Sequence, residues 1–300
     1  MPRGVPKSGF RLTQKRINQG LTRDTLPMVS QIQTQLVAPL SLPIHLETEE
    51  EIEHRLQTRF SALERFCKAT TVGKNPSMIL SGPTGVGKSF TVGKTLAAAG
   101  NSIYATVVKG FVRSTGLYKT LYEFRHPNSV VVFDDADSVF DDATSLNLLK
   151  AATDSTKRRR LHWLSETDMK DEDGSPIERQ FDFEGSVIFI TNYDFEDMIK
   201  RGSKLSPHFE ALMSRSHYLD LSMKSTLDYI VRIKQVIRDH NMLRDAGFSA
   251  DEEKEIIDFI QENKDNLREL SLRMVLKLSN IMRIDSENWK DLAKITCFKG

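Results

Sequence analysis

Five short apolar runs, separated by segments long enough to form helices, constrain this chain of 300 residues more than any other feature. Each run is rich in the β-branched and aromatic residues that favour strands. Strands that alternate with helices form a parallel sheet covered on both faces, because each crossover places a helix against the sheet. We therefore predict an α/β fold built on a five-stranded parallel sheet. The expected strands are residues 77–82, 102–108, 129–135, 186–192 and 217–221.

Helical patterns precede and follow the strand-rich region. Thr48 and Glu51 have the spacing of a capping box, and an apolar stripe with helical period follows them. Three further helices are predicted at the C-terminal end: near residues 227–237, after Ser249, and over residues 266–283. The chain should therefore have three parts: a basic N-terminal arm and linker (1–45), an α/β domain (46–222) and a small helical lid domain (223–300).

Charge and cysteine content limit the classes of function. Lys and Arg total 42 against 41 Asp and Glu, so attraction to nucleic acid must come from local patches. The two cysteines are far apart, which gives no disulfide framework and fits a reducing compartment. No apolar run approaches the roughly 20 residues that a membrane span needs. We expect a cytoplasmic protein with no membrane partner.

The sequence GPTGVGKS fits the phosphate-binding pattern G-x-x-x-x-G-K-[ST], directly after an apolar run and before a helical segment. Its glycines allow backbone N–H groups to point at phosphate oxygens. Lys88 should reach the β- and γ-phosphates, and Ser89 should bind Mg²⁺. The chain is therefore predicted to bind a nucleoside triphosphate. The expected binding residues are Gly82, Pro83, Thr84, Gly85, Val86, Gly87, Lys88, Ser89 and Phe90.

Two carboxylates end the third apolar run. One carboxylate at such a position can hold Mg²⁺ through water, and a second can accept a proton from the attacking water. We assign Asp134 to the metal and Asp135 to activation of the water. Asp137 is predicted to be structural, and Asp141 and Asp142 to begin the next helix, because short acids are good N-caps.

Together these motifs resemble the AAA+ ATPases over roughly residues 48–285. The resemblance implies that ATP is hydrolysed to ADP and phosphate in a homo-oligomer, most often a hexameric ring, whose subunits complete one another's sites. Asn192 falls where the family places a residue that orients the water. Arg215 falls where the family places the arginine finger that acts on the neighbour's γ-phosphate. The family normally has Asp-Glu where this chain has Asp134-Asp135, and the shorter base would lie further from the water.

A lid arginine that senses the phosphates is also implied by the resemblance, and two positions compete for it. Arg273 fits an S-x-R form and Arg268 fits an N-x-R-E-L form. Residues five apart on a helix point in different directions, so only one should reach the nucleotide. Arg273 is preferred.

About thirty residues separate the predicted helix 142–153 from the fourth run, where a few would suffice. They contain the basic segment TKRRRLHWL and a second segment with Phe181 and Phe183, joined through an Asp173-Gly174 turn, which predicts a β-hairpin. The insertion resembles the pre-sensor-1 β-hairpin group of AAA+ proteins, in whose DNA motors the hairpin points into the channel of the ring. In that interpretation the following cations contact DNA phosphates: Lys157, Arg158, Arg159 and Arg160.

The alternative is that the aromatic residues anchor the hairpin to the core. The arginines would then pair across it with Asp171, Glu172 and Asp173.

Three functions remain open from the sequence. The basic hairpin favours a DNA-directed motor, helicase-like or associated with replication, with nucleic acid and a replication protein as partners. Phe111, in the segment after the second run, favours a protein remodeller that grips polypeptide. Asp135 favours a slowly hydrolysing assembly switch. The compact form also resembles ATPases encoded by tailed bacteriophages, which would place the protein in the host cytoplasm.

Overall fold

The computed structural model describes residues 47–165, 168–171 and 173–300. The predicted N-terminal arm, residues 1–45, lies outside the described residues. The segment from Glu47 to Gly300 forms one compact unit. Within the described ranges, the structure contains no helix of the length and apolar character that a bilayer crossing requires.

The core is a five-stranded parallel sheet, as predicted, with strand order β2-β3-β6-β1-β7. Its strands are β1 (Ser77–Ser81), β2 (Tyr104–Lys109), β3 (Ser129–Asp134), β6 (Ser186–Thr191) and β7 (His217–Asp220). The three central strands are buried along their whole length, which explains why they read as continuous apolar runs. Since parallel strands end at one edge, the loops after β1, β3 and β6 lie close together there.

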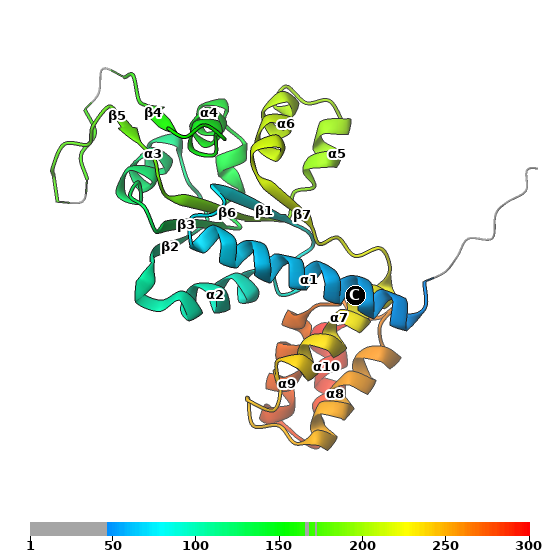
Figure 1. Cartoon of the computed structure of the whole chain (residues 1–300). Helices are drawn as coiled ribbons and strands as arrows, with labels where there is room; N and C mark the ends of the chain where they lie inside the picture. Colours follow the sequence, from blue (N-terminus) through cyan, green and yellow to red (C-terminus); the bar gives the residue numbers. More distant parts are fainter. Residues whose placement is uncertain (1–46, 166–167, 172) are drawn as a thin grey trace, which may run out of the picture. The chain divides into compact units, whose positions relative to one another are not determined.

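Helices cover both faces of the sheet (Figure 1). The helices α1 (Glu49–Thr71) and α2 (Lys88–Ala99) pack on the face that carries Met78 and Leu80. On the opposite face, around Ile79, lie α3 (Ser114–Glu123), α4 (Ala143–Ala152), α5 (Phe195–Lys200) and α6 (Ser206–Arg215). Short 3-10 helices occupy Gly100–Ser102 and Asp137–Phe140. The predicted capping box of α1 is confirmed in Thr48 and Glu51. Of the two acids expected to begin α4, Asp142 is the N-cap and accepts from two backbone N–H groups, whereas Asp141 ends the preceding 3-10 helix.

The C-terminal helices form a second apolar core with Trp289 buried inside it. They are α7 (Thr226–Asp239), α8 (Ala250–Glu262), α9 (Leu272–Ile284) and α10 (Trp289–Cys297). The predicted helix over 266–283 was wrong at its start, and α10 was not predicted. Ser271 caps α9 by accepting from the backbone of Met274, and Leu267 forms a bridge with Phe298. Residues 266–271 therefore run beside the C-terminal segment.

The predicted hairpin is present as the antiparallel pair β4 (Arg160–His162) and β5 (Gln180–Asp182), inserted between α4 and β6. Figure 1 shows it beside α3 and α4. Leu161 pairs with Phe181, and both side chains are buried in the core. Trp163 packs against Tyr118 of α3 with ring centroids 5.5 Å apart. The aromatic residues thus anchor the hairpin, as the alternative interpretation predicted.

Candidate nucleotide-binding site

The segment GPTGVGKS forms the loop between β1 and α2 together with the first two residues of α2, and positive φ angles at two of its glycines shape the approach to the lid. Gly87 is the N-cap of α2 with φ 101°, and Gly85 has φ 71°. A Cβ on Gly85 would lie 2.6 Å from the Cβ of Ser271 in the lid, so only glycine allows this approach. The Leu272 N–H donates to the carbonyl of Gly85 at 2.8 Å. The lid therefore contacts the phosphate loop directly.

Lys88 is buried at the start of α2, with only 5% of its surface exposed. Its Nζ donates to the carbonyls of Gly82 and Pro83 and to the Asn192 side-chain oxygen, the last at 3.0 Å. Burial lowers the pKa of Lys88 to about 8, although Asp135 and other nearby carboxylates oppose the shift. The ammonium is thus held in the loop and surrounded by oxygen acceptors, which phosphate oxygens can replace.

The lowered pKa predicts how nucleotide affinity depends on pH. Phosphate requires the charged form of Lys88, and binding an anion raises the pKa of that amine. Affinity should therefore be fully present below pH 8 and fall as pH rises through and above it, by up to about tenfold per unit. Calorimetric titration of ATP at several pH values between 6.5 and 9.5 measures this. A flat profile up to pH 9.5 would contradict the assignment of Lys88.

The two acids that end β3 differ in their surroundings. Asp134 is buried, and its Oδ1 accepts from the Ser89 hydroxyl at 2.7 Å while its Oδ2 pairs with the Lys109 ammonium at 2.9 Å. Asp135 is exposed and has the left-handed φ of 53° that non-glycine residues rarely adopt. The Asn192 amide nitrogen donates to the Asp135 carboxylate at 3.1 Å. Asn192 therefore links Asp135 to Lys88.

Asp137 lies deeper than Asp135 and accepts from the Thr191 hydroxyl at 2.6 Å. Burial raises the pKa of Asp137. This hydrogen bond ties the segment after β3 to the end of β6, so Asp137 positions the acid-bearing loop.

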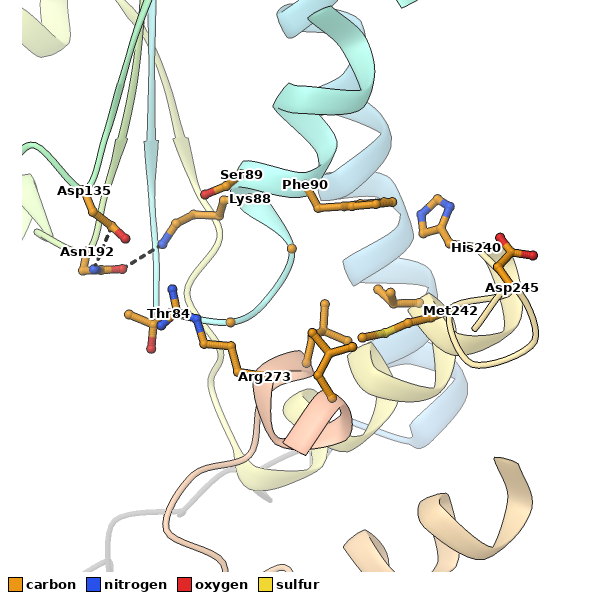
Figure 2. A pocket seen from close by; sticks show the side chains of 15 residues that line it. Thr84, Lys88, Ser89, Phe90, Asp135, Asn192, His240, Met242, Asp245 and Arg273 are labelled. Carbon is orange, nitrogen blue, oxygen red and sulfur yellow. Dashed lines mark hydrogen bonds between the residues drawn. The ribbon is translucent and has the colours of Figure 1, made fainter. Parts of the chain in front are cut away.

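A cavity of about 470 Å³ opens between the phosphate loop and the lid (Figure 2). Phe90 of α2 faces His240 across it, with ring centroids 5.6 Å apart. The apolar wall that they form suits a nucleobase, whereas Lys88 and Ser89 lie at the polar end. The full lining is Thr84, Gly85, Gly87, Lys88, Ser89, Phe90, Asp135, Asn192, Val236, His240, Met242, Asp245, Leu272, Arg273 and Leu276.

Most of the residues predicted for nucleotide binding meet in this cavity, but three do not line it. Gly82 offers its carbonyl to Lys88, Pro83 lines a neighbouring cavity, and Val86 is buried in the core. The lid side of the cavity was missed in the sequence. These residues are Val236, His240, Met242, Asp245, Leu272 and Leu276. Two sequence features could have indicated part of this side. Val236 belongs to the apolar stripe of the helix predicted near residues 227–237, and Leu272 is next to Arg273, the preferred lid arginine.

The structure separates the two candidate lid arginines. Arg273, in the first turn of α9, lines the nucleotide cavity (Figure 2). Arg268 precedes α9, and its Nε donates to the carbonyl of Phe298 at 2.7 Å, beside the neighbouring cavity. This placement favours Arg273 as the lid sensor.

Arg215, the predicted finger, is the last residue of α6 and does not line the nucleotide cavity of its own chain. Its Nε lies 3.5 Å from a carboxylate oxygen of Asp154, and its Nη1 donates to the carbonyl of Ala211 at 2.9 Å. The side chain is about one-third exposed. Arg215 therefore takes no part in the nucleotide cavity of its own chain, and its role as a finger for an adjoining chain stays a prediction.

The four cations of the hairpin have different surroundings. Arg159 is half-buried, donates to the carbonyls of Ala152 and Gly185, and has a pKa lowered by burial. It anchors the hairpin and is not placed to contact DNA. Arg158 and Arg160 are exposed and share Asp182. Their hydrogen bonds, that of Arg160 first, lower the pKa of Asp182 to about 2.

Arg158 and Arg160 thus pair with Asp182 and not with Asp171 or Asp173 as predicted, whereas Glu172, the third predicted partner, lies outside the described residues. The partner lies directly across the strand pair, because Arg160 is in register with Asp182. Lys157 is exposed.

Comparison with known proteins places these motifs in a family. Residues 78–202 match the family described as "ATPase family associated with various cellular activities (AAA)". The chain is also 35% identical over 249 residues to an "Uncharacterized 36.7 kDa protein in nrdC-mobD intergenic region" of Enterobacteria phage T4. That alignment covers 82% of this chain and 76% of the phage protein.

Solved structures show weaker similarity. A mutant of RuvB from Thermotoga maritima is similar at a TM-score of 0.48 and 14% identity, covering 83% of this chain and 73% of that one. Domain III of the replication initiation protein DnaA from the same organism is similar at a TM-score of 0.44 and 10% identity, covering 78% and 84%.

The family match spans the phosphate loop, the acid pair and Asn192. The phage protein extends the similarity over most of the chain. With the parallel sheet and the nucleotide cavity beneath a helical lid, these findings show that the chain belongs to the AAA+ family of ATPases.

Proposed function

We propose that the protein forms a homo-oligomeric ring, hexameric as is most frequent in the family, that couples ATP hydrolysis to the translocation or remodelling of DNA. The observation that carries this proposal is the inserted hairpin, which is rigidly anchored and presents Lys157, Arg158 and Arg160 to solvent. A motor needs such a connection, because force on a loosely attached loop would not reach the core. The proposed site of action is the host cytoplasm, given the phage relative.

In the proposed reaction, Lys88 exchanges its carbonyl partners for β- and γ-phosphate oxygens. Asp135 then accepts a proton from the attacking water, which the amide of Asn192 orients. Arg273 contacts the phosphates from the lid, and Arg215 of the adjoining subunit neutralises charge that develops on the γ-phosphate. The Asn192 side chain hydrogen-bonds both Lys88 and Asp135 in this structure. When phosphate oxygens replace Asn192 as a partner of Lys88, the Asn192 amide becomes free to turn and to change the position of the Asp135 carboxylate.

Mg²⁺ fits the oxygen atoms of Ser89 and Asp134. The two atoms lie 2.7 Å apart and are the hard donors that this ion prefers. The ion would neutralise phosphate charge when bound. The Lys109 ammonium, on the other carboxylate oxygen of Asp134, would compensate part of the negative charge in the absence of the ion.

A second candidate function, the remodelling of protein, is favoured by Phe111. Phe111 is 77% exposed in the segment after β2, which is unusual for a phenylalanine. The guanidinium of Arg113 lies 6.0 Å from the ring centroid. An exposed aromatic residue beside a cation could grip an unfolded polypeptide.

The substrate is identified by measuring ATP hydrolysis with single-stranded DNA, duplex DNA or an unfolded protein, each at two salt concentrations. A DNA motor should be stimulated by DNA and less so at high salt, because phosphate contacts release counterions. Replacing Lys157, Arg158 and Arg160 together with Ala should reduce DNA affinity by about tenfold or more at low salt. Basal hydrolysis should be retained.

The matched control removes three exposed lid lysines, Lys254, Lys290 and Lys294, and should leave DNA affinity within about twofold. Stimulation by unfolded protein alone, lost on Phe111→Ala, would establish the second candidate function. DNA that neither binds nor stimulates would overturn the first.

A further inference from the structure

The lid helix α7 carries an arginine into the interior, behind the phosphate loop. Arg232 is 5% exposed, and its Nε donates to the carbonyl of Val86 at 3.1 Å. Its guanidinium carbon lies 3.3 Å from the centroid of the Phe60 ring on α1, a cation–π contact. Arg232 therefore joins the lid, the first helix and the phosphate loop.

This buried charge has no carboxylate partner within the described part of the chain. Asp239 and Glu64 act on it only from a distance, and burial lowers the pKa of Arg232 to about 10. The guanidinium still carries its charge at neutral pH. An unpaired buried cation destabilises a folded protein, so its presence calls for a compensating anion.

The phosphate loop is next to the unpaired charge. A Cβ on Gly87 would lie 3.4 Å from Nη2 of Arg232, and Gly87 itself lines the nucleotide cavity. Arg232 itself does not line that cavity, and it contacts the loop through the carbonyl of Val86.

We propose that Arg232 is a positioning residue that serves as a buried counter-charge for the nucleotide's phosphates. Its burial destabilises the nucleotide-free protein, and phosphate binding relieves that cost. Because the lid provides this charge, a lid that moves away from the loop weakens phosphate binding even where the base remains in place. The inference depends on the nucleotide site alone and not on the proposed ring or DNA substrate.

The proposal predicts an unusual pair of effects for Arg232→Met, which keeps the length and apolar contacts of the side chain. The nucleotide-free protein should unfold at the same temperature as the wild type or at a higher one, because an unpaired buried charge is gone. Affinity for ATP should fall about tenfold, the size expected for a charge acting across a loop at an effective dielectric constant of about 20. Affinity for ADP should fall less, and affinity for adenosine should not change.

Thermal unfolding of the full-length chain and calorimetric titration of the three ligands measure these effects. The matched control is Arg55→Met. Arg55 is also on the contact between α1 and α7, but it is paired with Asp228 and Glu47. Its loss leaves the buried Asp228 without that partner, so the control should unfold at a lower temperature. The ratio of ATP to adenosine affinity should stay as in the wild type.

A structural role for Arg232 gives the opposite pattern. If Arg232→Met lowers the unfolding temperature and leaves the ratio of ATP to adenosine affinity unchanged, the proposal is overturned. Should that variant fail to fold, Arg232→Lys preserves the charge without the Nε–H bond to Val86. It is expected to keep most of the preference for ATP, and loss of that preference in a folded Arg232→Lys protein would also overturn the proposal.

Discussion

Lys88→Ala is expected to weaken ATP binding by about a hundredfold or more. Two or three charge-assisted hydrogen bonds to phosphate oxygens are lost, each worth about 1.5–3 kcal/mol. The fold should survive, because the substitution removes a buried cation whose pKa is already lowered. Calorimetric titration of the purified variant measures the change.

The control for Lys88→Ala is Lys94→Ala, which removes an exposed lysine from the same helix, α2. Its affinity should stay within about twofold of the wild type. Near-normal affinity in Lys88→Ala would show that ATP is not held by the loop in the way described.

Arg215→Ala is expected to lower the rate of hydrolysis by about a thousandfold while ATP affinity changes little. An arginine that stabilises the transition state from outside the site contributes about 10³–10⁵ in rate in nucleotide-hydrolysing enzymes. The residue lies away from its own cavity, where it holds Asp154, so binding should be nearly unaffected. Steady-state turnover and a separate binding titration distinguish these two effects.

Arg201→Ala is the control for Arg215→Ala, since it removes an exposed arginine that pairs only with Asp197 on α5 among the described residues. Its turnover should match that of the wild type. A decrease of less than tenfold for Arg215→Ala would remove this residue from the catalytic machinery.

The strands and the phosphate loop could be predicted from the sequence because their signals are local. A central parallel strand is buried throughout and mostly apolar, and the loop needs its glycines and Lys88 at fixed spacing. The hairpin could be predicted because the connection before β6 was too long, and the structure confirms it. These inferences require only neighbouring residues and the rules of chain connection.

The lid side of the cavity could not be predicted, because it depends on how the segment after α7 packs beside the phosphate loop. His240 and Met242 follow α7 and have no pattern that marks them as nucleotide contacts. The start of α9 was misjudged for a related reason. Residues 266–271 continue the helical apolar pattern, but Ser271 caps the helix and Leu267 pairs with Phe298. Contacts distant in sequence decided both outcomes.

Strand register explains the remaining error. The sequence predicted that the arginines pair with acids near the Asp173-Gly174 turn. The observed register instead places Asp182 opposite Arg160. Arg159 alternates to the inner side and bonds two carbonyls. Alternation along a strand therefore divides one basic run into an anchoring arginine and exposed cations.

A subunit-mixing measurement of ATP hydrolysis tests the central claim most directly, which is that each active site is completed by an adjoining copy of the chain. Lys88→Ala subunits cannot bind ATP but still present Arg215, whereas Arg215→Ala subunits bind ATP but lack the finger. Mixed at ratios from 1:9 to 9:1 and allowed to exchange, the two inactive proteins should regain hydrolysis, with a maximum at intermediate ratios. Activity that equals the sum of the two separate variants at every ratio would contradict the account.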